Sequence, residues 1–237
     1  MSPRARALFL ALILIVAAVC VRLGLWQSHR LVERRALNAV YAARRAMPPL
    51  HLPGDPLPAD SGGLTERRLR VTGRYDAANQ TVLRGMPYRD APGVHLITPL
   101  RIAGSDSAVL IDRGFVPAAD AVHPDLNVPP DTGVVTVSGL ALALRTLPDS
   151  GQPVTSGELL TWRRLDWAAL ERRLGYPLLD VFLLASRPPE GRGEGSFPIA
   201  IPEPELTDGP HLSYAIQWFA FATIAVVGGA ILIWRSR

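Results

Sequence analysis

The sequence predicts a membrane α+β protein in which two transmembrane helices, one N-terminal and one C-terminal, flank an antiparallel β-rich extracytoplasmic domain. Three observations predict this: an apolar segment near each end of the 237 residues, arginines beside both segments, and short β-like runs between them. The mean hydropathy of +0.17 is high for a chain that is 19% charged. We expect transmembrane helix 1 over 7–26, a helical extension over 27–47, the β-rich domain over 48–208 and transmembrane helix 2 over 212–234.

The first apolar segment runs unbroken from Ala7 to Val21 and continues past Arg22 to Trp26. This is about the 20 residues that span a bilayer. Arg22 lies close enough to the far end for its guanidinium to reach the headgroups. A cleaved signal peptide is the alternative, because basic residues precede the segment, but no polar, small-residue cleavage region follows it. We therefore expect an uncleaved anchor.

The second apolar segment extends from Tyr214 to Trp234, with aromatic residues at both edges as membrane interfaces favour. Arg235 and Arg237 follow it, so the excess of positive charge places the C-terminus in the cytoplasm. Two spans return the N-terminus to the same side. We therefore expect a multi-pass protein with both termini cytoplasmic and its main domain extracytoplasmic.

Between the two segments, the pattern predicts a helix that ends at Pro48-Pro49 and then mainly strands. A short helix is expected over Asp166–Leu174, since Asp166 suits an N-cap and Gly175 a C-cap. An irregular linker is expected over 187–207. Hairpin-length links between strands favour a sheet closed or folded on itself. The expected strands are Arg68–Tyr75, Thr81–Met86, Val94–Ile102, Ala108–Val116, Val134–Ala143, Leu160–Leu165 and Leu178–Ser186.

Several classes of function have no support in the sequence. All 25 basic residues are arginine, and none of them forms a basic run interleaved with aromatics, so we expect no nucleic-acid partner. The lone Cys20 cannot form an intramolecular disulfide. Nucleophile motifs are absent, and no two of the five histidines are spaced as zinc ligands, so we expect no enzyme and no catalytic residue.

The most specific signal lies at the start of the second apolar segment. His211, Tyr214 and Trp218, together with Phe221, share one helical face. Such a face could lay a porphyrin against the rings while His211 ligates the haem iron. An interfacial aromatic belt is the alternative interpretation of the same residues. Both interpretations stay open on the sequence alone.

The outer end of the first segment carries matching features. Gly24 would let a second helix approach closely. If the two helices pack, Arg30 or Arg34 would lie near His211 and could pair with haem propionates. Binding of lipid phosphate by these arginines is an equally good interpretation of their charge.

These segments carry a resemblance to the Surfeit locus protein 1 family. The stretch from Leu23 to Arg35, LGLWQSHRLVERR, is similar to the signature that closes that family's first helix, and Gly209 to Ala222 is similar to its motif at the second. Three internal segments agree in order: Gly73–Tyr75, Pro92–Leu100 and Val109–Pro117. The chain departs from the family pattern at Arg34, Asp112 and Phe115.

The resemblance implies an assembly factor for haem-copper cytochrome c oxidase that acts in maturation of subunit I, has subunit I and other oxidase assembly factors as partners, and holds or transfers haem a. The family's candidate ligand corresponds to His211. A membrane-anchored scaffold without a cofactor is the alternative. The lone Cys and three Met residues do not suit a copper donor. With no transit peptide ahead of the first span, we expect a bacterial inner membrane.

Overall fold

The computed structural model describes residues 2–58, 60–124, 133–144, 153–156, 159–186 and 197–235. The chain divides into two compact units. Residues 1–40 and 205–237 form the helical unit, and residues 41–204 form the barrel unit.

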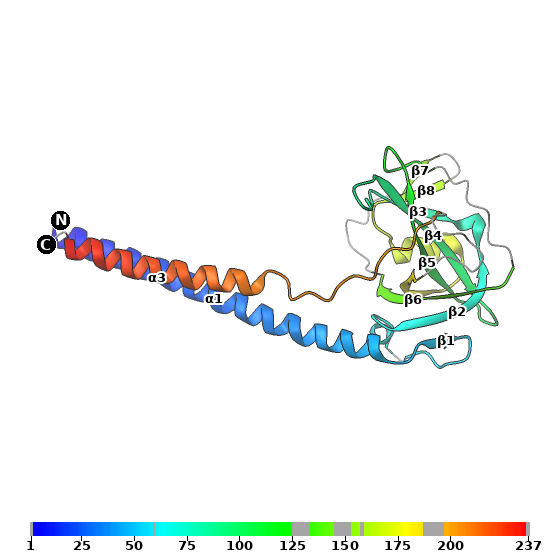
Figure 1. Ribbon diagram of the computed structural model, residues 1–237, viewed down its shortest axis with the longest axis horizontal. Helices are drawn as coiled ribbons and strands as arrows, with labels where there is room; N and C mark the ends of the chain where they lie inside the picture. Colours follow the sequence, from blue (N-terminus) through cyan, green and yellow to red (C-terminus); the bar gives the residue numbers. More distant parts are fainter. Residues whose placement is uncertain are drawn as a thin grey trace. The chain divides into compact units, whose positions relative to one another are not determined.

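The helical unit consists of residues 3–40 of α1 (Pro3–Ala46), whose residues 41–46 belong to the barrel unit, and of α3 (His211–Arg235). The expected first span and its extension are therefore one continuous helix, which ends just before Pro48. Helix α3 runs antiparallel beside α1, so the first turn of α1 and the last turn of α3 lie at the same end (Figure 1). Both helices are long and apolar enough to cross a membrane.

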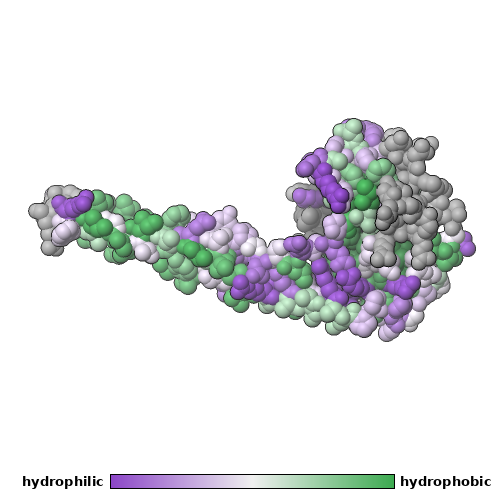
Figure 2. Space-filling view, viewed as in Figure 1, coloured by the Kyte–Doolittle hydropathy of each residue, from purple (hydrophilic) through white to green (hydrophobic). Residues whose placement is uncertain are grey.

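Apolar side chains cover much of the visible surface of the two helices (Figure 2). Leu8 on α1 and Trp234 on α3 are each 73% exposed. Soluble proteins rarely leave a continuous apolar surface of this kind uncovered. The helical unit therefore has the exposed apolar surface that a membrane-spanning helix pair would have.

The barrel unit contains one sheet of nine strands among its described residues. Each expected strand is present, within a few residues of its expected bounds, whereas two three-residue strands, β1 and β7, escaped prediction because they are too short for a pattern. The strands are β1 (Leu50–Leu52), β2 (Arg68–Tyr75), β3 (Thr81–Arg84), β4 (Gly93–Ile102), β5 (Ala108–Pro117), β6 (Val135–Ala143), β7 (Val154–Ser156), β8 (Leu159–Trp162) and β9 (Leu178–Ala185).

The expectation of an antiparallel sheet is only partly right, because the sheet is mixed. Strands β2, β6, β9, β5 and β4 pair in that order, and β4 pairs back onto β2, which closes a ring. Within the ring, β5 and β9 are parallel. The pairs β1–β2 and β3–β8 outside it are parallel too. A parallel pair needs a long connection, and residues 118–177 supply one between β5 and β9.

Ring closure depends on Gly73, the residue at which β2 changes partner. Up to Gly73 the strand pairs with β6, and from Gly73 to Tyr75 it pairs with β4. A Cβ atom at position 73 would lie 2.1 Å from the carbonyl oxygen of Arg101. Only glycine lets the two backbones approach this closely. The family-like Gly73–Tyr75 segment is thus the corner of the barrel.

The barrel interior is filled by side chains. Residues that point inward from every strand of the ring form one buried cluster. Leu69 and Val71 of β2 belong to it, and they alternate with the outward arginines 68 and 70. This alternation is why the strand could be recognised from the sequence.

Strands β4 and β5 are buried on their outer face as well. Trp162 of β8 and Leu170 of α2 (Trp167–Leu174) pack over Leu110 there, in a second buried cluster. As expected, α2 begins at Asp166, whose side chain accepts a hydrogen bond from the Ala169 N–H (3.0 Å). The connectivity of the ring, with its single parallel pair, is that of the OB-type barrel. Such barrels bind oligonucleotides and oligosaccharides on the outer face of their second and third strands. In this chain those strands are β4 and β5, and residues of β8 and α2 cover that face.

Tyr176 ties the end of α2 to the far side of the barrel. Its hydroxyl donates a hydrogen bond to Asp76 (2.8 Å), and the Arg101 guanidinium stacks over its ring. Burial raises the pKa of the Tyr176 hydroxyl, and the Asp76 carboxylate raises it further. The hydroxyl therefore stays protonated as a donor well into the alkaline range.

The expected linker over 187–207 falls partly outside the described residues, since residues 187–196 are not among them. The described part packs on the barrel: Ile199 exchanges two backbone hydrogen bonds with Phe115 of β5, both 2.8 Å. Gly114, at φ 117°, makes room for this crossing, because a Cβ there would lie 2.0 Å from the Ile199 carbonyl oxygen. Arg68 pairs with Glu203 through two hydrogen bonds of 2.6 and 3.0 Å. The chain is therefore fixed to the barrel before it leaves for α3.

Candidate functional site

The candidate site depends on how closely α1 and α3 pack. Their buried residues recur at intervals of three, four or seven, which puts them on one face of each helix. Most of these residues are small. The Phe219 ring of α3 lies directly over Gly24 of α1, so the two helices approach closely at this glycine, as expected. Ile13 packs over Gly229 in the same way. The buried residues are Ala17, Cys20, Gly24 and Leu31 on α1 and Ala215, Ala222 and Gly229 on α3.

Polar contacts hold the segment before α3 against α1. Arg34 and Asn38 both donate to the carbonyl oxygen of Thr207, at 3.3 and 3.0 Å. Arg35 forms an ion pair with Asp208 at 2.8 Å. Exposed pairs of this kind contribute about 0–1 kcal/mol each, so their main consequence is to fix which residues of the two helices face each other.

This register brings His211 to Gln27. His211 is the first residue of α3 and is half-buried. Its Nδ1 atom lies 2.8 Å from Oε1 of Gln27 on α1. Gly209, with a φ of 70° that favours glycine, makes the turn just before it. His211 is thus held at the junction of the two helices.

The aromatic residues of the expected stripe are only partly brought together. Trp218 and Phe221 form an edge-to-face pair with ring centroids 5.9 Å apart. Tyr214 is 45% exposed and Phe221 is 51% exposed, so both rings face outward from the helix pair. Trp218 is half-buried between them along the helix. The stripe therefore offers an uncovered aromatic surface beside His211.

Arg30 is engaged within its own helix. Its guanidinium donates to Glu33 at 2.6 Å, and the imidazole of His29 contacts the same carboxylate at 3.2 Å. The arginine that reaches the segment before α3 is Arg34, through Thr207. Arg30 thus lies one helical turn from Gln27 with a carboxylate partner of its own.

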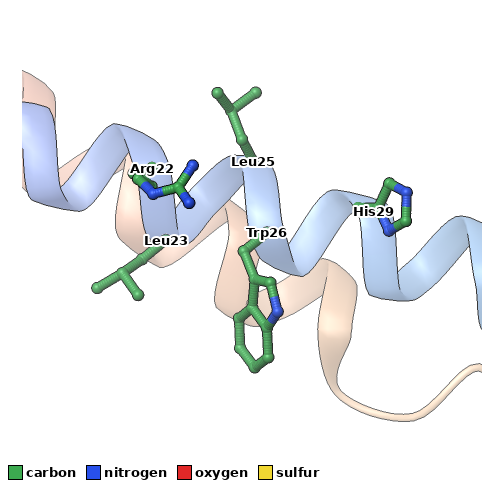
Figure 3. A pocket seen from close by; sticks show the side chains of 5 residues that line it. All are labelled: Arg22, Leu23, Leu25, Trp26 and His29. Carbon is green, nitrogen blue, oxygen red and sulfur yellow. The ribbon is translucent and has the colours of Figure 1, made fainter.

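An open groove of about 560 Å³ runs along the outer part of α1. It is lined by Arg22, Leu23, Leu25, Trp26 and His29 (Figure 3). The view shows Leu23 and Trp26 on one side of the helix and Leu25 on the other. The groove marks the level at which the apolar part of α1 gives way to its polar extension, which suits the headgroup depth of a membrane.

The barrel unit holds a buried histidine that sequence spacing does not reveal. His95 on β4 and Asp112 on β5 lie 2.8 Å apart, and both are buried. The second oxygen of Asp112 accepts a hydrogen bond from the Gly114 N–H (3.0 Å). The pair joins two strands of the barrel wall. No group of three His, Cys, Asp or Glu side chains positioned for a metal occurs within the described ranges.

The arrangement presents the imidazole of His211 at the junction of α1 and α3, with one ring nitrogen facing Gln27. Among the expected residues, the structure places His211, Tyr214 and Trp218 on the first turns of α3, with Arg30 on the neighbouring helix. It adds Gln27, which sequence reasoning missed. The only signal for Gln27 was a polar residue at the polar end of the first span, and its partner depends on the register of the helices.

A protein-family model described as the SURF1 family matches residues 14–223 of the chain. A SURF1-like protein of Monosiga brevicollis is 28% identical over 95% of this chain and 87% of its own length. A SURF1-like protein of Rickettsia conorii is 22% identical over 95% of this chain and 90% of its own length. Surfeit locus protein 1 of Homo sapiens is 24% identical over 89% of this chain and 72% of its own length. These similarities extend across the helical unit and the barrel unit alike.

Proposed function

The chain belongs to the SURF1 family, and on that premise we propose that it is an assembly factor for haem-copper cytochrome c oxidase that acts in maturation of subunit I. The observation that carries the proposal is the His211–Gln27 contact, which fixes a histidine at the outer end of two paired apolar helices. The expected partners are subunit I and other oxidase assembly factors.

We propose that both helices span a bacterial inner membrane. Helix α3 has 25 residues, which at 1.5 Å per residue makes it about 37 Å long, enough to cross a hydrocarbon core of about 30 Å. Arg4 and Arg235 mark the shared end of the two helices, and positive charge favours the cytoplasmic side. The barrel unit then lies outside the cytoplasm.

Reporter fusions test this orientation. A periplasm-active phosphatase fused after Ser150 is expected to be active, and the same reporter fused at the C-terminus is expected to be inactive. A cytoplasm-active reporter should give the reverse pattern. A phosphatase that is inactive at Ser150 and active at the C-terminus would contradict the orientation.

We propose that haem a is the cargo of the site. His211 would offer one ring nitrogen to the haem iron, since the other is engaged by Gln27. The exposed ring of Tyr214 and the half-buried ring of Trp218 would support the porphyrin face, and Arg30 would approach its propionates by releasing Glu33. Haem a supplies the iron porphyrin that subunit I needs. The exposure of the rings suits a surface from which a cargo is released.

Deletion of the gene in its own host tests the proposal. The deletion strain is expected to lose most cytochrome c oxidase activity together with the haem a bands of its membranes, because subunit I would not mature. Both should return when the full chain is supplied on a plasmid. Normal oxidase spectra and activity in the deletion strain would exclude the assembly role.

A second candidate function is a scaffold that holds a partner without any cofactor. It is favoured by apolar residues that stay exposed on the polar part of α1: Val32 is 67% and Val40 48% exposed. These side chains lie beyond the apolar segment, where lipid would not cover them. Full oxidase maturation with a His211→Ala variant would favour the scaffold over the haem site.

A further inference from the structure

We propose that Gln27 is a positioning residue that fixes the tautomer of His211, so that Nε2 is the ring nitrogen available to a ligand. The inference rests on the proposed function for the identity of the ligand. The choice of tautomer does not rest on it. It follows from the contact between the two helices.

The chemistry of the contact determines where the proton lies. Oε1 of Gln27 is an amide oxygen, which can only accept a hydrogen bond. In the orientation that the structure gives the Gln27 amide, Nδ1 of His211 lies 2.8 Å from this oxygen and is therefore the donor. A neutral imidazole carries one N–H, so its lone pair is on Nε2. A free imidazole side chain in water prefers the opposite tautomer, which means that the contact reverses the intrinsic preference.

The residue that borders the Nε2 edge of the ring is Gly209, which has no side chain. A Cβ atom built on Gly209 would lie 3.7 Å from Nε2 and 3.6 Å from Cδ2. Position 209 therefore borders this edge of the ring, and because it is glycine it places no side chain there. The φ of 70° at Gly209 gives a separate reason for glycine at this position.

The rest of the helical unit fixes the geometry of the contact. Arg34 and Asn38 hold Thr207, four residues before His211, against α1. Less than one turn before Gln27 on α1, Gly24 packs against the Phe219 ring of α3. A hydrogen bond between two such restrained groups selects both the tautomer and the orientation of the ring.

A neutral hydrogen-bond acceptor at position 27 also suits release of the haem. A carboxylate at position 27 would increase the basicity of Nε2 more than an amide does, and would strengthen its bond to iron. The amide of Gln27 orients the ring without adding charge. This is the arrangement expected of a site that passes its cargo to another protein.

The test uses the full chain in lipid nanodiscs, with ¹⁵N-labelled histidine and with haem b as the added probe. In the native protein, the NMR spectrum should show His211 protonated at Nδ1 and unprotonated at Nε2. The Gln27→Leu variant should shift toward the Nε2–H tautomer and bind haem b roughly tenfold or more weakly. Gln27→Glu keeps a hydrogen-bond acceptor on a side chain of similar size. It should therefore show the Nδ1–H tautomer of His211 and bind haem b as the native protein does.

Gln217→Leu is the matched control, because Gln217 is an exposed glutamine of α3. It should leave tautomer and binding unchanged. The inference is overturned if Gln27→Leu keeps the Nδ1–H tautomer, or if Gln27→Glu behaves like the leucine variant. If the native protein shows the expected tautomer but binds neither haem b nor haem a, the proposed cargo is wrong and the role of Gln27 in setting the tautomer stands.

Discussion

Replacement of Gly73 by alanine is expected to destabilise the barrel unit by about 3 kcal/mol or more. The added Cβ would lie 2.1 Å from the Arg101 carbonyl oxygen and 2.9 Å from its carbon. Both are backbone atoms of β4, so the clash cannot be relieved by a change of rotamer. The ring would have to open between β2 and β4.

Thermal unfolding of the purified protein, followed by the circular dichroism of the barrel, measures this effect. A loss of 3 kcal/mol corresponds to a fall in Tm of roughly 6–12 °C for a domain of this size. Gly62→Ala is the control in the same unit, because a Cβ there would meet only the Asp60 carboxylate at 3.6 Å. If the two variants unfold at the same temperature, β2 does not close the barrel at Gly73.

Replacement of His211 by alanine is expected to abolish haem retention and to leave the fold intact. The variant removes the imidazole that lies beside the exposed ring of Tyr214 and the half-buried ring of Trp218. Gln27 and the contacts at Thr207 remain, so the helices should still pair. Bound haem, measured by pyridine haemochrome assay after purification, should fall roughly tenfold or more.

His29→Ala is the matched control for this variant. His29 lies on the same helical unit, its side chain is 73% exposed, and its contact is with Glu33 on its own helix. It should retain haem at the native level. Equal losses in both variants would mean that haem associates with the surface of α1 and not with the junction at His211.

Much of the architecture could be predicted because it depends on local patterns. The apolar segments, the alternation in β2 and the capping residues of α2 each show within a few neighbouring residues. The pairing of the strands does not. The parallel contact of β5 with β9 and the closure of β4 onto β2 involve residues far apart in sequence, and nothing in either strand specifies its partner.

The candidate site shows the same division. His211 and its aromatic neighbours share a face by helical spacing alone, so they could be named from the sequence. Gln27 could not, since it is 184 residues from His211 and its role depends on the register of two antiparallel helices. That register is fixed by the packing of small residues and by contacts at Thr207 and Asp208. Arg30 was expected near His211 on charge, yet it pairs with Glu33 on its own helix.

The most direct test of the central claim is the absorption spectrum of the intact protein purified from cells that make haem a. We expect haem a bands in the native protein, and their loss in the His211→Ala protein purified in parallel. A native protein that is colourless when taken from such cells, or an alanine variant with the same bands, would contradict the claim that the helix junction holds haem a through His211.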